Sequence, residues 1–225
     1  MMKIIVFMML TALGLCAIDA DAQTPADAQQ ATDKAAKTKA LMMMWMGPSF
    51  TEADYQLTLA VAHRDDVQAE VALKNGADPN FLDLNNGTQL MLACQNGPVK
   101  LVELLLKHGA KPDLVDADGL TPLMIASRGY RPEITKVLLE YGANPNIKSH
   151  NNDSISAKMG GTEGYTALML ACRTSTLAMV RILLDHGADP RCVGADGKTA
   201  LDIVKQRSRW QEQEPTIELL EQKLK

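Results

Sequence analysis

The chain has 225 residues and a formal net charge of −4 at neutral pH. Apolar residues make up 46% of the chain and aromatic residues only 4%. This length suits one domain or one short array of repeats, with a core built mainly from Leu, Ala, Val and Met. The mildly acidic balance excludes broad nucleic-acid binding, because such binding needs a strongly basic face.

The chain begins with a predicted secretory signal peptide, residues 1–22. The positively charged Lys3 precedes an apolar run over residues 4–15, and Ala20 and Ala22 then match the small positions of an A-x-A cleavage site. We therefore expect the mature protein to be periplasmic or secreted, with an uncleaved N-terminal anchor as the alternative. No later stretch of the sequence is long and apolar enough to span a membrane, so no span is expected after signal cleavage.

The next segment, residues 23–50, differs from the rest in composition. Its first part is rich in Ala and polar residues, which is typical of a flexible segment or a loosely formed helix. It then carries a cluster of methionines around Trp45, namely Met42, Met43, Met44 and Met46. This cluster is expected to cover the open end of the following domain. The alternative is Cu(I) binding in an exported protein, since thioethers are soft ligands.

From Thr51 onward the sequence repeats itself. A Gly-Ala pair recurs at a spacing of 33, 33 and 45 residues, with its glycines at Gly76, Gly109, Gly142 and Gly187. A Thr-x-Leu motif recurs at a spacing of 33, 45 and 33 residues, with its threonines at Thr88, Thr121, Thr166 and Thr199. Two independent markers thus share one 33-residue period and one insertion of 12 residues, which predicts a stacked array of repeats.

Each unit has the signals of a helix pair. The threonine can accept a hydrogen bond from a free backbone N–H at a helix start, and Pro122 suits a first helical turn. Two short apolar helices follow, and the glycine can end the second one in a left-handed conformation. Neither helix can bury its apolar face alone, so the units must stack into an elongated array.

The pattern resembles the ankyrin repeat, whose consensus runs roughly from G-x-T-P-L-H-x-A to G-A-D-x-N. The resemblance covers about residues 51–207 and implies an all-α solenoid of about five helix–turn–helix units, with β-turn or hairpin fingers, in a domain over residues 51–225. The units are expected at residues 53–82, 83–115, 116–148, about 161–193, and 194–225, the last being a cap.

The sequence departs from this consensus at the histidine of the T-P-L-H motif. Met91, Met124, Met169 and Asp202 stand there. We expect thioether packing to replace the hydrogen bonds of the histidine. The first unit has Tyr55 where the others have the threonine, and its second helix is expected to be one residue short, as suits a capping repeat.

The insertion, residues 149–163, is polar, contains glycines and enters at a fingertip. In repeat proteins such insertions lie in loops on one face, often the binding face. The alternative is a tolerated surface loop with no partner, because long surface insertions cost little free energy.

By implication of the resemblance, partners bind to the fingertips and to the exposed ends of the inner helices. The fingertip candidates are Asp116, Asp118, Leu120, Tyr165, Asp196 and Lys198. The inner-helix candidates, Arg128 and Arg173, lie one repeat apart and are expected to hold an acidic partner residue together. Tyr165 and Trp210 are expected to be exposed aromatic anchors. For any single tip residue the alternative is a role in shaping the turn, as is common for Asp and Asn.

The sequence has no pattern of an enzyme site. It contains no nucleophile–base arrangement, phosphate-binding loop or metal-ligand cluster, so we expect no catalysis, no cofactor and no metal in the repeats. The prediction is a monomeric protein–protein interaction module acting in the periplasm or outside the cell. The alternatives are an exported effector or inhibitor of a foreign protein, and copper handling by the methionine cluster.

Overall fold

The computed structural model describes residues 36–37, 40, 49–83, 86–150, 163–174, 176–206 and 213–225. The predicted signal peptide, the methionine cluster at residues 42–46, most of the insertion and Trp210 lie outside the described residues. The predictions made for those segments therefore stay predictions.

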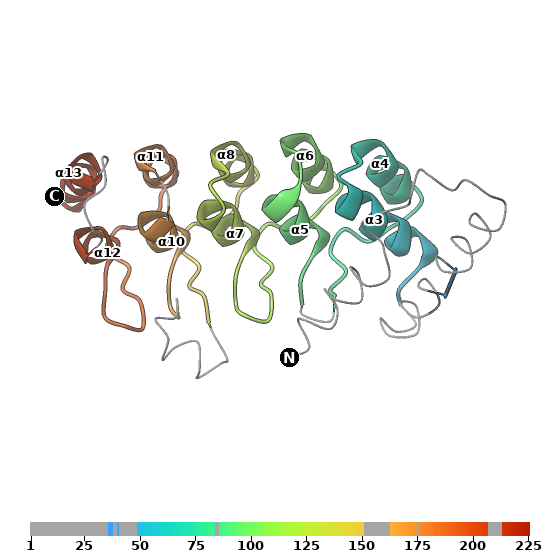
Figure 1. Cartoon of the computed structure of the whole chain (residues 1–225), viewed down its shortest axis with the longest axis horizontal. Helices are drawn as coiled ribbons and strands as arrows, with labels where there is room; N and C mark the ends of the chain where they lie inside the picture. The colour runs from blue at the N-terminus through green and yellow to red at the C-terminus, as the bar shows by residue number, and fades with distance from the viewer. Residues whose placement is uncertain are drawn as a thin grey trace, which may run out of the picture.

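The described residues form five helix pairs stacked side by side in two layers (Figure 1). The inner layer holds the first helix of each pair: α3 (Glu52–His63), α5 (Gln89–Asn96), α7 (Pro122–Arg128), α10 (Ala167–Thr174) and α12 (Ala200–Gln206). The outer layer holds the second: α4 (Asp66–Lys74), α6 (Val99–Lys107), α8 (Pro132–Glu140), α11 (Leu177–Asp185) and α13 (Gln213–Leu224). The predicted all-α solenoid of about five helix–turn–helix units is confirmed.

The inner helices begin where the Thr-x-Leu motif predicts. In each of the last four units the threonine hydroxyl accepts a hydrogen bond from the backbone N–H three residues later, which satisfies one of the free donors of the first turn. The N–O distances are 3.2 Å, 3.2 Å, 3.4 Å and 3.3 Å at Thr88, Thr121, Thr166 and Thr199.

The outer helices end where the Gly-Ala pair predicts. The four glycines, Gly76, Gly109, Gly142 and Gly187, all have a left-handed backbone with φ between 84° and 91°. An added Cβ would meet no atom within 4 Å at any of them. The requirement for glycine there is therefore set by the backbone conformation and not by the neighbouring packing.

The core is a continuous row that neighbouring repeats share. Both layers contribute leucines at equivalent positions, and all of these are almost completely buried: Leu90, Leu123 and Leu168 from the inner helices, and Leu105, Leu138 and Leu183 from the outer helices. Because each helix contacts the equivalent helix of the next repeat, the array is held by interfaces between neighbours.

A ladder of side chains also joins the loops of successive repeats. The amide of Asn80 donates to the carbonyl of Gly109 (2.9 Å) and accepts from the N–H of Lys111 (2.8 Å). Asn146 makes the same two bonds, with Gly187 (3.0 Å) and Asp189 (2.8 Å). The asparagine of the G-A-x-P-N motif thus fixes the spacing between two repeats.

The first unit differs from what its sequence predicts. Thr51, four residues before Tyr55, caps α3 and forms a capping box with Asp54, so this helix is one turn longer than the other inner helices. The expectation that α4 is one residue short is wrong, since α4 has nine residues, as α6 has. Within the described ranges no helix is long and apolar enough to cross a membrane.

Candidate partner-binding surface

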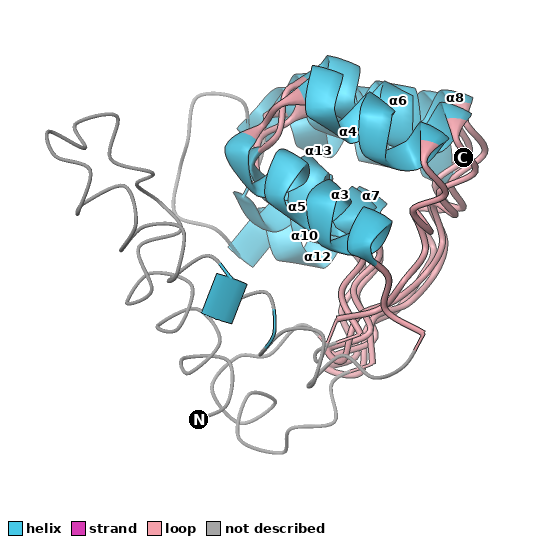
Figure 2. Cartoon of the chain, turned by 90° about the vertical axis from the view of Figure 1, so that its right-hand side faces the viewer, coloured by secondary structure: helices cyan, strands magenta, loops and turns pink. Residues whose placement is uncertain are grey.

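The fingers and the inner helices together form the candidate surface. The loops between successive units project on one side of the stack, below the inner layer in Figure 1, and lie one behind another in the end view (Figure 2). Each finger leads directly into the threonine that caps the next inner helix. The exposed face of the inner helices is therefore bounded on one side by a row of fingers.

The finger before α7 shows that its aspartates shape the turn. One carboxylate oxygen of Asp116 accepts from the backbone N–H groups of Asp118 and Leu120, both at 2.9 Å. The prediction that Leu120 lies on the contact surface is wrong, because its side chain is only 8% exposed and belongs to the core. Leu120 directly precedes the helix cap, where the chain turns into the stack. Asp116 and Asp118 remain partly exposed at the tip.

The insertion leaves this turn intact. Ser149 takes the place of Asp116: its N–H donates to the carbonyl of Tyr165 (2.9 Å), and its carbonyl accepts from Gly164 (2.8 Å). The hydroxyl of Ser149 also accepts from the N–H of Tyr165 (3.1 Å). The hydrogen bonds of Ser149 with Gly164 and Tyr165 thus close a finger turn of the normal kind. Removal of residues 151–162 would leave Ser149-His150-Glu163-Gly164, which has the length of the Asp116–Gly119 turn.

Tyr165 joins this finger to the next one. Its side chain is only 5% exposed, and a Cβ on Gly194 would lie 2.8 Å from its ring. Its hydroxyl donates to the carboxylate of Asp196 (2.8 Å), which also pairs with Lys198 (3.3 Å). The prediction that Tyr165 is an exposed anchor is wrong, since its ring packs against the glycine backbone of the neighbouring finger. The structure does bring Tyr165, Asp196 and Lys198 together, as a clasp between two fingers.

The electrostatics of this finger clasp follow from its burial and hydrogen bonds. Burial, and then the hydrogen bond to Asp196, raise the pKa of Tyr165 to about 12. Burial acts to raise the pKa of Asp196 as well, but the hydrogen bonds from Tyr165 and Lys198 outweigh it, so the pKa of Asp196 is lowered. Both groups therefore keep their ordinary charge states at neutral pH, with the phenol as donor and the carboxylate as acceptor.

The inner-helix candidates lie on the exposed face as predicted. Arg128 and Arg173 are both exposed, at equivalent positions of α7 and α10, and these two helices pack against each other. The same position is exposed in the neighbouring helices, where it is occupied by Gln95 and Gln206. A row of polar side chains thus runs along the stack, with two guanidinium groups at its centre.

Two apolar residues of this face were missed by sequence reasoning. Leu92 and Ile125 lie one turn before Gln95 and Arg128, and both are only partly buried. The equivalent Leu170 is 1% exposed. The spacing of three residues from the exposed position was the signal that could have identified them, because residues i and i+3 share a helix face. The open apolar part of the face therefore lies in the second and third repeats.

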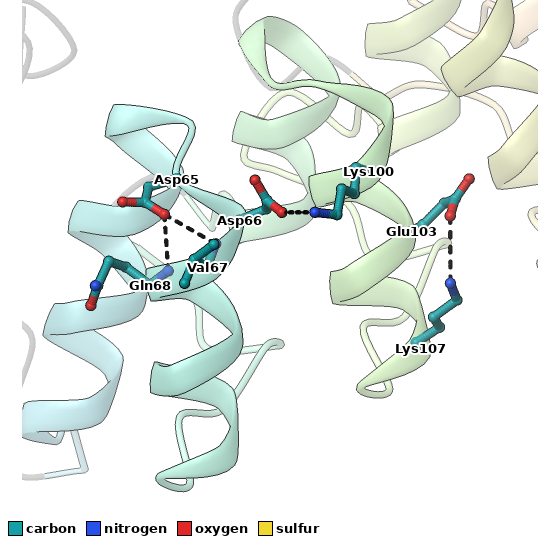
Figure 3. A network of polar contacts seen from close by, with 7 residues as sticks. All are labelled: Asp65, Asp66, Val67, Gln68, Lys100, Glu103 and Lys107. Carbon is teal, nitrogen blue, oxygen red and sulfur yellow. Dashed lines mark hydrogen bonds and ion pairs between the residues drawn. The ribbon is translucent and has the colours of Figure 1, made fainter.

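The outer layer carries a different arrangement of charges (Figure 3). Lys100 of α6 pairs with Asp66 of α4, and their hydrogen bond raises the pKa of Lys100 and lowers that of Asp66. Glu103 and Lys107 pair within α6 at 3.5 Å. In each of these two pairs at the surface, the positive charge of the lysine offsets the negative charge of the carboxylate. In the described ranges no three His, Cys, Asp or Glu side chains are grouped to hold a metal ion.

Comparison with protein families identifies the repeat. A family model of three ankyrin repeats matches residues 57–149, and a second model of ankyrin repeats matches residues 150–204. The chain belongs to the ankyrin-repeat family. Ankyrin repeats are generally protein–protein interaction modules and are typically non-catalytic. A comparison with curated proteins finds no match to this chain.

This ankyrin-repeat protein uses two solutions at the position of the consensus histidine. In the three middle repeats the position is a buried methionine, as the predicted thioether packing requires. At Met91, however, the sulfur also accepts a hydrogen bond from the backbone N–H of Thr88 (N–S distance 3.5 Å), so packing does not wholly replace the hydrogen bond to the threonine there. At the last repeat Asp202 accepts from both the N–H and the hydroxyl of Thr199, at 2.9 Å and 2.6 Å. Asp54 makes the equivalent pair of bonds in the first repeat.

Proposed function

We propose that this ankyrin-repeat protein is a monomeric, non-catalytic module that holds another protein and acts in the periplasm or outside the cell. The observation that carries the proposal is the row of exposed inner-helix positions with Arg128 and Arg173 at its centre. These side chains project from helices whose other faces are occupied by the stack. Support for export comes from the signal-like sequence of residues 1–22.

The chemistry of the row indicates what the partner presents. A guanidinium group can bind a carboxylate through two parallel hydrogen bonds, and Arg is enriched at the energetic centres of interfaces. The partly buried Leu92 and Ile125 supply apolar area beside it. An acidic segment of a protein that carries an apolar side chain fits this surface. Asp116 and Asp118 place negative charge at the finger side of this surface. This charge favours one orientation of the bound segment.

Affinity capture from the native compartment tests this surface. We expect the double variant Arg128→Glu/Arg173→Glu to lose at least tenfold in affinity for the partner recovered by the wild type, because a loss of ~1.4 kcal/mol corresponds to tenfold. The matched control is Lys136→Glu/Arg181→Glu, which makes the same change in charge on exposed residues of the outer helices α8 and α11. Equal recovery by both double variants would exclude the proposed surface.

Deletion of residues 151–162 tests the contribution of the insertion. The shortened chain keeps the Ser149–Tyr165 and Ser149–Gly164 hydrogen bonds, so we expect its free energy of unfolding to change by less than about 1 kcal/mol. A binding loop would show as a weaker complex of a stably folded protein. Undiminished affinity would mean that the insertion is only a tolerated loop. Large destabilisation would contradict the conclusion that a normal finger lies beneath it.

The identity of the captured protein separates this proposal from its alternative. A partner from the same organism supports a resident binding module, whereas one from a host or competitor supports an exported effector or inhibitor. Since the methionine cluster lies outside the described residues, no contact in the structure favours copper handling.

A further inference from the structure

Tyr130 is an exposed aromatic side chain in the turn between α7 and α8. Its exposed fraction is 54%, compared with 5% for Tyr165. It lies two residues after Arg128, at the edge of the stack where inner helices end and outer helices begin. This turn edge is separate from the fingers, which lead into the other ends of the inner helices (Figure 2).

The backbone of Tyr130 has an unfavourable conformation. Its φ is 57°, in the left-handed region where residues with a Cβ are disfavoured. The equivalent residue one repeat earlier, Gly97, has an extended backbone with φ −80°, whereas Arg64, in the turn after α3, is left-handed as Tyr130 is, with φ 61°. Because glycine has no Cβ to clash at a positive φ, it would suit the left-handed turn of the third repeat better on conformational grounds. Stability alone does not account for a large, exposed side chain at this position.

The turn that carries Tyr130 is held in place by the preceding repeat. The guanidinium of Arg131 donates to the carbonyl of Gln95 (3.2 Å) and to the carbonyl of Gly97. The N–H of Arg131 donates to Ala126 (3.2 Å), and α8 begins directly afterwards at Pro132. The backbone that carries Tyr130 is therefore ordered before a partner binds, so binding costs no backbone entropy at this turn, which favours an interface anchor.

The charges of the turn edge favour an acidic partner. Four arginines lie in or next to these turns, namely Arg64, Arg128, Arg131 and Arg173. Of the nearby carboxylates, Asp65 caps α4 and Asp66 pairs with Lys100. Glu133, in the first turn of α8, is exposed. In the third and fourth repeats Arg128, Arg131 and Arg173 thus outnumber Glu133, and the edge around Tyr130 carries an excess of positive charge.

From the exposure, the backbone conformation and the fixed turn, we infer that Tyr130 is an aromatic anchor for an acidic protein segment that carries apolar side chains. This inference rests on the proposed function and extends the contact surface from the inner-helix row to the turn edge. Tyr and Arg together are the side chains that most often dominate interface energetics. Arg128 belongs to both surfaces and connects them.

A glycine substitution separates binding from folding. Tyr130→Gly removes the ring and relieves the backbone, so we expect a Tm equal to or above that of the wild type. The probe is a fluorescein-labelled ten-residue peptide of alternating Glu and Leu, followed by fluorescence anisotropy at low salt. Tyr130→Gly is expected to weaken its binding at least fivefold, while Tyr130→Phe stays within twofold of the wild type. A purely structural role would instead lower the Tm of the glycine variant.

Two controls make the result specific. Tyr141 is 40% exposed at the opposite end of α8, and Tyr141→Ala should leave peptide binding unchanged. A peptide with Lys in place of Glu should bind at least tenfold more weakly than the acidic one. The inference is overturned if Tyr130→Gly binds the acidic peptide as the wild type does, or if the Lys peptide binds equally well. If, in addition, Arg128→Glu/Arg173→Glu still abolishes capture of the native partner, the proposed function stands and only the anchor fails.

Discussion

Thr135 shows how the repeat itself identifies an unfavourable residue. Its hydroxyl is buried in α8 without a hydrogen-bond partner among the described residues, and the equivalent residues, Val102 and Val180, are completely buried valines. Burying an unpaired hydroxyl costs roughly 1–3 kcal/mol. We expect Thr135→Val to raise the free energy of unfolding by about 1 kcal/mol, measured by urea denaturation. The reverse change, Val180→Thr, should lower it. A destabilised Thr135→Val protein would show that the hydroxyl is paired in solution.

The loop ladder has one weaker step, at Asp113. Its carboxylate accepts from the N–H of Asn144 (2.9 Å), but it cannot donate to a carbonyl as Asn80 and Asn146 do. Asp113→Asn supplies the missing donor, so we expect a gain of about 0.5 kcal/mol in the free energy of unfolding. Asn146→Asp is the matched reversal and should cost a similar amount. If Asp113→Asn gains nothing, the ladder works through its acceptors alone.

At the scale of the elements, local signals predicted where the helices begin and end, whereas long-range contacts determined which side chains are exposed. Threonine caps and glycine ends act within one turn of chain, so the sequence alone located the start of each inner helix after the first and the end of each outer helix before the last. The burial of Tyr165 depends on Gly194 in the next finger, 29 residues later, where no side chain obstructs its ring. Such a contact has no local pattern, and fingertip position alone therefore overestimated its exposure.

The finger clasp is tested by Tyr165→Phe. The change removes the hydrogen bond to Asp196 and keeps the ring on Gly194, so we expect a loss of about 1 kcal/mol in unfolding free energy at neutral pH. Because folding raises the pKa of Tyr165 to about 12, the stabilisation is complete below pH 10 and is lost as the pH rises through 12. Urea unfolding at several pH values should show the stability advantage of the wild type shrinking as the pH rises from 10 to 12. A difference that stays constant with pH would contradict the role of the phenol.

At the scale of the whole molecule, the two ends of the stack are closed differently. At the first end α3 carries an extra helical turn, and the ring of Phe50 packs edge-on against Phe81 with centroids 5.2 Å apart. At the other end α13 packs on α11 and α12, buries Leu219 and Leu220, and turns charged residues to the solvent. The last helix therefore covers apolar surface that a further repeat would otherwise cover, as a capping element does.

Truncation after Gln206 tests how far the array depends on this cap. Removing α13 exposes the apolar surface that Leu219 and Leu220 cover, and each buried leucine is worth roughly 1.5–3 kcal/mol, so we expect a loss of about 4 kcal/mol in urea unfolding followed by circular dichroism. The cap also makes two exposed ion pairs, Lys205–Glu221 (3.0 Å) and Lys223–Asp185 (3.4 Å). The double variant Lys205→Ala/Lys223→Ala should cost less than about 1 kcal/mol, because exposed pairs contribute little. If the double variant is as unstable as the truncated chain, charge and not apolar burial closes this end of the stack.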